Sequence, residues 1–250
     1  MIRLKRVDFP YSLSYNELVL RDFEKYYYPK LVRDETTGTR LYKTPEGDLV
    51  PSVTNILSKT KDTKHLERWK KRVGKKEARR ITTEACNIGT SMHLFLESYI
   101  LDEKPKHMQS YTPSPTHSQA KVMADVIIEN GLKYVDEIWG SEVQLYYKDQ
   151  YAGTTDVVGM YKGVPHIIDF KQTNRPKKEE WIQDYYLQLC AYAHAHNHVA
   201  GTDIRNGVVL MCSRDRTFQQ FEMNEIQFDK YTYMWFNRVK EYNTLLEKTT

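Results

Sequence analysis

Two aspartates and a lysine in the second half of this 250-residue chain have the types and spacing suited to metal chemistry. Asp156 ends the segment Gly-Thr-Thr-Asp, and Asp169 is followed two residues later by Lys171. The turn residues Lys162-Gly163 between them predict a two-residue hairpin loop. In that register Asp156 lies directly opposite Asp169. Lys171 points to the same face, because side chains alternate along a strand.

Two carboxylates that face each other on neighbouring strands repel, so a sheet does not keep this pair for stability. A divalent cation between them removes the conflict, and oxygen ligands of this kind suit Mg²⁺ or Mn²⁺. A lysine beside the ion could orient or deprotonate a water, or stabilise the charge that grows on a phosphate. The alternative is a solvated sheet face, since Asp-x-Lys by itself is a weakly specific motif.

Other polar residues are candidates for the same site. Gln188 and Tyr192 are four residues apart on a predicted helix and therefore share a face, although taken alone an ordinary helix–sheet contact explains them better. His93 lies on a predicted apolar helix, where a histidine is usually part of the core; it becomes a metal ligand only beside the two aspartates. Glu142 begins the strand before Asp156. It could act as a base beside the site or as a ligand of a second metal, but we favour a charged strand end.

The elements that must position these residues predict one α/β (α+β) domain, a central mixed sheet flanked by helices. The turn at 45–48 predicts a short hairpin, and Ser52 is a suitable N-cap for a helix that ends near Leu57. We expect later helices at about 88–100, 119–129, 179–196 and 228–247, strands at 141–148, 152–161, 164–171, 206–213 and 216–223, and a loop at 103–118.

Positive charge is concentrated in residues 59–80, which hold eleven Lys/Arg and three Asp/Glu, although the whole chain has a formal net charge of only +4. Leu66, Trp69 and Val73 recur there at helical spacing, which predicts an amphipathic helix with a cationic outer face. Such a patch favours a nucleic-acid partner, and the alternative is an ordinary solvated helix face. The expected DNA contacts are Lys64, Arg68, Lys70, Lys71, Arg72, Lys75, Lys76, Arg79 and Arg80.

Several short motifs occur in the same order as in a known family, namely His93, Asp156, Asp169-Phe170-Lys171 and Gln188-Leu-Cys-Ala-Tyr192. The set resembles the RecB-type branch of the PD-(D/E)XK nucleases, and within it the mitochondrial genome maintenance exonuclease and its phage and bacterial relatives. The similarity covers about residues 50–245. It implies a restriction-endonuclease-like core and a metal-dependent exonuclease that hydrolyses phosphodiester bonds at the ends of single-stranded DNA, in replication, repair or recombination.

The resemblance also implies roles for single residues. Asp156, Asp169 and the backbone carbonyl of Phe170 would hold the Mg²⁺ or Mn²⁺ ion, with His93 as a further ligand. Lys171 would be the catalytic lysine. The Q-x-x-x-Y element beside the site would be formed by Gln188 and Tyr192, which we count with the catalytic residues.

The family pattern divides the chain into an N-terminal extension, residues 1–50, packed on the core, and a nuclease domain, residues 51–250, with an inserted basic helical region at about 59–118. Three scattered cysteines cannot supply the four-cysteine iron–sulfur cluster of some relatives, so no such cluster is expected. No apolar run approaches the about 20 residues of a membrane span, and no targeting segment is evident. We therefore expect a monomeric protein of bacterial or viral origin in the cytoplasm.

Two other functions remain open at this point. One is a structure- or site-specific endonuclease of the same fold. The other is a non-catalytic DNA-binding module, against which the intact Asp–Asp–Lys set argues.

Overall fold

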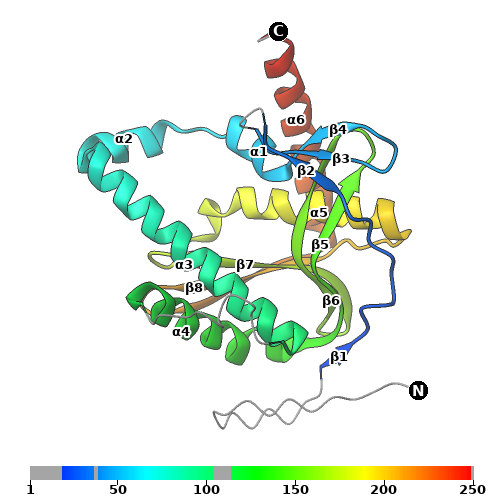
Figure 1. Cartoon of the computed structure of the whole chain (residues 1–250), viewed down its shortest axis with the longest axis horizontal. Helices are drawn as coiled ribbons and strands as arrows, with labels where there is room; N and C mark the ends of the chain where they lie inside the picture. Colours follow the sequence, from blue (N-terminus) through cyan, green and yellow to red (C-terminus); the bar gives the residue numbers. More distant parts are fainter. Residues whose placement is uncertain (1–18, 37–38, 104–113, 249–250) are drawn as a thin grey trace.

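The computed structural model describes residues 19–36, 39–103 and 114–248, and a six-stranded mixed sheet forms its centre (Figure 1). Along the sheet the strands are β1 (Leu20–Arg21), β5 (Val135–Tyr147), β6 (Tyr151–Tyr161), β7 (Val164–Thr173), β8 (Gly207–Ser213) and β9 (Phe218–Met223). The pairs β1–β5 and β7–β8 are parallel, and the other three are antiparallel. The predicted α/β domain around a mixed sheet is confirmed.

Helices pack against both faces of this sheet. On one face lie α3 (Lys75–Leu101) and α4 (Pro115–Asn130); on the other lie α1 (Val53–Lys59), α5 (Gln183–Ala200) and α6 (Glu225–Glu247). Because side chains alternate along a strand, β7 gives Ile168 and Phe170 to the α3 face and Ile167 to the α5 face. Asp169 and Lys171 therefore belong to the α5 face.

Short helical turns connect these elements, namely η2 (Leu132–Tyr134) before β5 and η3 (Glu179–Trp181) before α5. Within the three described ranges, no helix combines the length and apolar character that crossing a membrane requires.

A second, three-stranded antiparallel sheet is formed by β2 (Val32–Asp34), β3 (Leu41–Lys43) and β4 (Leu49–Pro51). The β3–β4 pair is the hairpin predicted around 45–48. Tyr42 and Val50 of this small sheet are buried against Tyr146 and Ala152 of the β5–β6 hairpin. The described part of residues 1–50 thus lies on the core, and β4 crosses the expected boundary at residue 50. Residues 1–18 lie outside the described part of the chain.

The turn between β6 and β7 has the predicted geometry. Lys162 and Gly163 have φ values of 51° and 77°, as a type I′ turn requires. The predicted register holds for five pairs, from Tyr161–Val164 beside the turn to Val157–Ile168. The turn residues alone were therefore sufficient to align these two strands.

Beyond Val157 and Ile168 the two strands separate, and the predicted cross-strand pairing of the aspartates is wrong. β6 stays paired with β5 as far as Tyr151, whereas β7 stays paired with β8 as far as Thr173. The sheet forks here, as Figure 1 shows where β5 and β6 curve away from β7 and β8. Asp156 and Asp169 are the first residues beyond the fork on their strands.

Helix α4 begins at Pro115, inside the segment predicted as a loop at 103–118. Ser114 is its N-cap, and the Ser114 side chain accepts a hydrogen bond from the backbone N–H of His117. Proline is favourable in the first helical turn because the N–H groups of that turn have no acceptor within the helix, so a residue without an N–H loses no hydrogen bond. The proline that indicated a loop therefore starts a helix. Residues 104–113 lie outside the described ranges.

Strand β5 begins at Val135, six residues earlier than expected at 141. Its register with β6 shifts by one residue twice, between Val135 and Glu137 and between Ile138 and Gly140. Such bulges interrupt the alternation of apolar and polar side chains that identifies a strand in a sequence.

Gly159 of β6 faces this irregular part of β5, and we predict that Gly159→Ala destabilises the protein. A β-carbon at residue 159 would lie 2.1 Å from the carbonyl oxygen of Glu137, and a backbone obstacle cannot rotate away. The free energy of unfolding, measured by urea denaturation, should fall by about 2 kcal/mol or more. The control is Gly89→Ala in α3, where a β-carbon meets no atom within 4 Å and should slightly stabilise the helix. Equal losses in both variants would contradict the close approach.

Candidate active site

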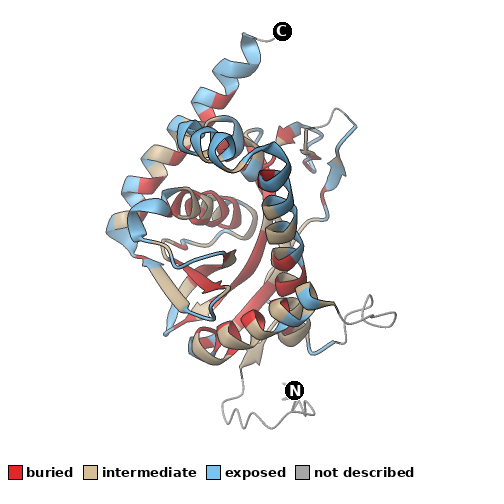
Figure 2. Cartoon of the chain, turned by 90° about the vertical axis from the view of Figure 1, so that its left-hand side faces the viewer, coloured by how far each residue is buried: buried red, intermediate tan, exposed pale blue. Residues whose placement is uncertain are grey.

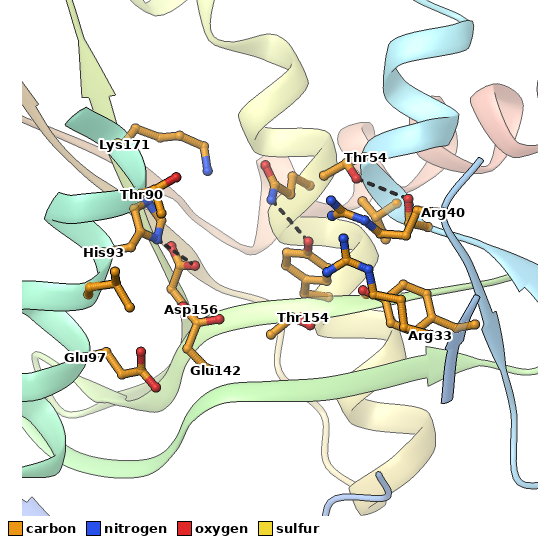
Figure 3. Close-up of a pocket in the computed structure, with 18 residues that line it drawn as sticks. Arg33, Arg40, Thr54, Thr90, His93, Glu97, Glu142, Thr154, Asp156 and Lys171 are labelled. Atoms are coloured by element: carbon orange, nitrogen blue, oxygen red, sulfur yellow. Dashed lines mark hydrogen bonds and ion pairs between the residues drawn. The ribbon is translucent and has the colours of Figure 1, made fainter. Parts of the chain in front are cut away.

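A pocket with a volume of about 460 Å³ opens at the fork of the sheet (Figure 3). Helix α3 forms one wall, α5 a second, and the small β2–β3–β4 sheet with the start of α1 a third. The candidate residues from the sequence that line it are His93, Asp156, Lys171, Gln188 and Tyr192. Five of the predicted site residues, from four elements, therefore meet in one cavity.

Asp156 replaces part of the ladder that is lost at the fork. Its Oδ2 atom accepts a hydrogen bond from the backbone N–H of Phe170 at 2.7 Å. Since the N–H and C=O of a strand residue point to the same side, the carbonyl of Phe170 faces the same gap. Burial alone would raise the pKa of Asp156, but the positive charges of His93 and Lys171 outweigh it and lower that pKa.

Asp169 and Lys171 form an ion pair beside Asp156, and both lie on the same face as predicted. The Asp169 side chain is 1% exposed, and its Oδ2 atom is the one that contacts Nζ of Lys171. Burial, with Asp156 adding to it, raises the pKa of Asp169 to about 6 despite the nearby ammonium group. Burial therefore disfavours the charged form of Asp169 even beside a lysine.

His93 reaches this group from α3, on the other face of the sheet. Its Nδ1 atom lies 3.4 Å from Oδ1 of Asp156, and its ring contacts the ring of Phe170 edge-on. Burial opposes protonation of the imidazole, but the charge of Asp156 outweighs burial and raises the pKa of His93 to about 9. The histidine thus compensates part of the negative charge in the pocket.

Glu142, which we interpreted as a charged strand end, also belongs to the pocket. Its neighbours Ser141 and Val143 pair with Val157 and Thr155. Glu142 of β5 therefore lies opposite Asp156 of the adjacent strand β6. Its φ of 50° is uncommon for a residue other than glycine. Counting the β5–β6 register from the turn at residues 148–150 would have identified it, because that part of the hairpin is regular.

The donor atoms in this pocket fit a divalent cation. His93, Glu142 and Asp156 each offer one ligand atom, and these three atoms lie within 4.8 Å of one another. The Asp169 carboxylate, which is paired with Lys171, and the carbonyl of Phe170 add further oxygen donors. The carboxylate and carbonyl oxygens suit Mg²⁺ or Mn²⁺, whereas the one imidazole is a donor more typical of transition metals.

Gln188 and Tyr192 share a face of α5, as their spacing predicted. The Gln188 side-chain amide donates a hydrogen bond to the Tyr192 hydroxyl at 3.2 Å, and Tyr192 is buried. Gly153 of β6 lies against this tyrosine: a β-carbon on it would come within 2.9 Å of the ring. The pair therefore forms the closely packed surface that α5 gives to the pocket, between α3 and the small sheet.

The nine basic candidates lie outside the pocket. They occupy α2 (Lys64–Val73) and the first turns of α3, two helices that meet at Gly74, whose φ is 83°. All nine are exposed, and α2 contains no buried residue. Figure 1 shows α2 standing away from the body, and Figure 2 colours most of it as exposed. Lys75 lies eighteen residues before His93 in α3, a rise of roughly 27 Å.

Two details modify the prediction for this region. Leu66, Trp69 and Val73 form the expected stripe, but they are half-buried and not part of a core. Arg80 is paired with both Glu77 and Glu84, so it is less available to a phosphate than the other eight.

Comparison with known proteins identifies relatives of this chain. Mitochondrial genome maintenance exonuclease 1 of Xenopus tropicalis is 31% identical over 166 residues, which are 60% of this chain and 44% of that protein. The mouse protein of the same name is 28% identical over 207 residues, 77% of this chain and 59% of that one. The chain thus spans about half the length of the curated relatives it matches. The predicted resemblance to this group is confirmed.

No family model matches the chain. A solved structure from Eubacterium rectale, provisionally named an exonuclease, superposes with a TM-score of 0.46 and 14% identity, over 63% of this chain and 64% of that one.

The crowding of carboxylates predicts a pH-dependent gain in stability for Glu142→Gln. Burial, followed by the charge of Asp156, raises the pKa of Glu142 to about 7. A carboxyl whose pKa is raised by folding favours the folded state below its ordinary pKa, and this contribution is lost as the pH rises through 7. In chelator, the variant should therefore be more stable than the original chain at pH 8 by about 1 kcal/mol, a figure reduced for solvent screening.

The gain should disappear at pH 4.5, and urea denaturation at the two pH values measures it. Glu241→Gln on the exposed side of α6 is the control and should change stability little at either pH. A gain for Glu142→Gln that is the same at both pH values would contradict the electrostatic explanation.

Proposed function

We propose that this chain is a metal-dependent nuclease that hydrolyses phosphodiester bonds of DNA, acting as an exonuclease on single-stranded ends. The observation that carries the proposal is the meeting of Asp156 and Lys171 in the pocket at the fork, with the buried Asp169 paired to Lys171 behind its lining. The names of the curated relatives, genome maintenance exonucleases, support the same function.

In this proposal Asp156, Asp169, the Phe170 carbonyl and His93 hold the Mg²⁺ or Mn²⁺ ion, and Glu142 joins them. The bound ion would polarise a phosphoryl oxygen and lower the pKa of a coordinated water. The ammonium group of Lys171 orients the attacking water and stabilises charge that develops on the phosphate.

Substrate class follows from shape and charge. The pocket is enclosed by α3, α5 and the small sheet, and its volume is that of a small-ligand pocket, which suits one extended strand better than a duplex. The cationic arm of α2 and early α3 would bind the strand through its phosphates, with no dependence on sequence. Gln188 and Tyr192 would contact the strand at the floor of the pocket.

The catalytic assignment predicts that Asp169→Asn and Lys171→Ala each reduce cleavage at least about a hundredfold while strand binding persists. Cleavage is followed with end-labelled single strands in Mg²⁺ or Mn²⁺, and binding by fluorescence anisotropy in chelator. Lys240→Ala, an exposed lysine on α6, is the control and should retain full activity. Full activity in either pocket variant would overturn the assignment.

Closed circular single strands distinguish the exonuclease from its alternatives in the same assay. An exonuclease needs an end and leaves circles intact. Cleavage of circles would support the endonuclease, and the absence of any metal-dependent product would support a non-catalytic DNA-binding module.

The arm predicts a salt effect. Replacing Lys70, Lys71 and Arg72 by glutamate should weaken single-strand binding and reduce the slope of log affinity against log salt by about 2, since each lost phosphate contact contributes roughly 0.7. Anisotropy titrations between low and moderate salt measure this slope. Lys230→Glu, Lys240→Glu and Lys248→Glu, three exposed residues of α6 and its C-cap, serve as a charge-matched control. An unchanged slope would mean that the arm does not contact phosphates.

A further inference from the structure

The wall of the pocket farthest from the acidic cluster carries two arginines. Arg33 of β2 and Arg40, which directly precedes β3, both line the cavity, as does Thr54 of α1. In Figure 3 the two guanidinium groups extend inward, across the pocket from Asp156 and Lys171. The proposed metal site gives these two side chains no role.

The small sheet fixes the direction of both side chains. Arg33 is the cross-strand partner of Tyr42, and Arg40 precedes Tyr42 by two residues, so all three share one face. Tyr42 is buried and itself lines the pocket. The backbone carbonyl of Arg40 also accepts hydrogen bonds from the Ser52 N–H and the Asn55 side chain, which attach it to the start of α1.

One carboxylate holds the two guanidinium groups together. Oε1 of Glu35 accepts from Nε of Arg33 at 2.9 Å and from Nε of Arg40 at 3.2 Å, and it also contacts Nη2 of Arg33. Two cations against one anion leave a net positive charge at this wall. Among the described residues, Nη1 of Arg33 and both Nη atoms of Arg40 have no hydrogen-bond acceptor and remain available to a ligand.

The pocket is therefore electrically two-ended, with carboxylates on one side and guanidinium groups on the other. Planar guanidinium donors match the oxygen geometry of a phosphate and bind it through paired hydrogen bonds. A nucleic-acid strand carries a phosphate at every nucleotide, so a strand with one phosphate at the acidic end, beside a metal, presents another to the opposite wall.

We propose that Arg33 and Arg40 form a second phosphate subsite, which binds the phosphate next to the scissile phosphodiester. Binding there fixes which phosphodiester bond of the strand lies beside Lys171 and Asp156. This inference rests on the proposed function. The phosphate is either an internal linkage of the strand or a terminal phosphate, because both present the same oxygens.

A chemical double-mutant cycle tests the subsite. Single-stranded oligonucleotides are made with one neutral methylphosphonate linkage, moved one position at a time, and their affinities are measured in chelator. The original chain should lose about tenfold in affinity when the neutral linkage occupies the subsite. The variant R33Q/R40Q should bind unmodified strands about tenfold more weakly, with a salt slope lower by roughly 0.7, and should not respond to that linkage.

Strand ends separate the two sources of phosphate. Oligonucleotides with a phosphate or a hydroxyl at the 5′ or the 3′ end are compared in the same assay. A preference for one phosphorylated end that disappears in R33Q/R40Q identifies a terminal phosphate. Coupling to an internal methylphosphonate alone identifies an internal linkage. Either result supports the subsite.

Two further variants keep the test interpretable. Lys43→Gln is the control, because Lys43 is exposed on the same small sheet, on the face opposite Tyr42, and does not line the pocket. R33K/R40K keeps the charge but loses the planar donors, so it should bind with intermediate affinity. If R33Q/R40Q matches the original chain, or if both respond equally to every neutral linkage, the subsite is wrong.

The outcomes distinguish this inference from the proposed function. Binding is measured without metal, whereas cleavage is measured separately in Mg²⁺ or Mn²⁺. A chain that shows the coupling but cleaves nothing would overturn the nuclease and retain the subsite. A chain that cleaves but shows no coupling would overturn the subsite alone.

Discussion

The fork between β6 and β7 is the constraint on which the rest of this site depends. Separating two paired strands leaves backbone groups without ladder partners, and the carboxylate of Asp156 satisfies one of them by accepting from the Phe170 N–H. Asp169 lies beside the same separation, where burial is the main cause that raises its pKa to about 6 and the charge of Asp156 adds to it. Two buried carboxylates, each beside a cationic side chain, are brought together by the way the sheet divides.

The fork also joins the two faces of the sheet. In an unbroken sheet, the side chains of α3 and α5 would be kept apart by a layer of backbone. Here His93 from α3 reaches Asp156, and Gln188 and Tyr192 from α5 line the same cavity. The β2–β3–β4 sheet then closes the third side. The helices α3 and α5, the small sheet and the forked strands are far apart in the sequence. They contribute to one pocket because the pairing of β6 with β7 ends after Val157 and Ile168.

Sequence reasoning succeeded where local chemistry decides the structure. The Lys162-Gly163 turn aligned β6 with β7, and Ser52 marked the start of α1, because a type I′ turn and an N-cap depend on a few neighbouring residues. The fork could not be predicted, since it reflects how β6 pairs with β5 and β7 with β8. Glu142 was interpreted as a charged strand end although its strand was predicted, because its register against Asp156 was not counted from the 148–150 turn. Arg33 was missed because a short strand gives no sign of what it packs against.

The α2 arm has a different thermodynamic character from the body that carries it. A ten-residue helix without a buried side chain gains little from packing, and helices of this length are marginal on their own in water. Its amide hydrogens should accordingly exchange through local opening, while those of the central strands exchange only when the whole domain unfolds. The free energy that orders this arm would then come from ligand binding and not from folding, so its conformation can adapt without weakening the core.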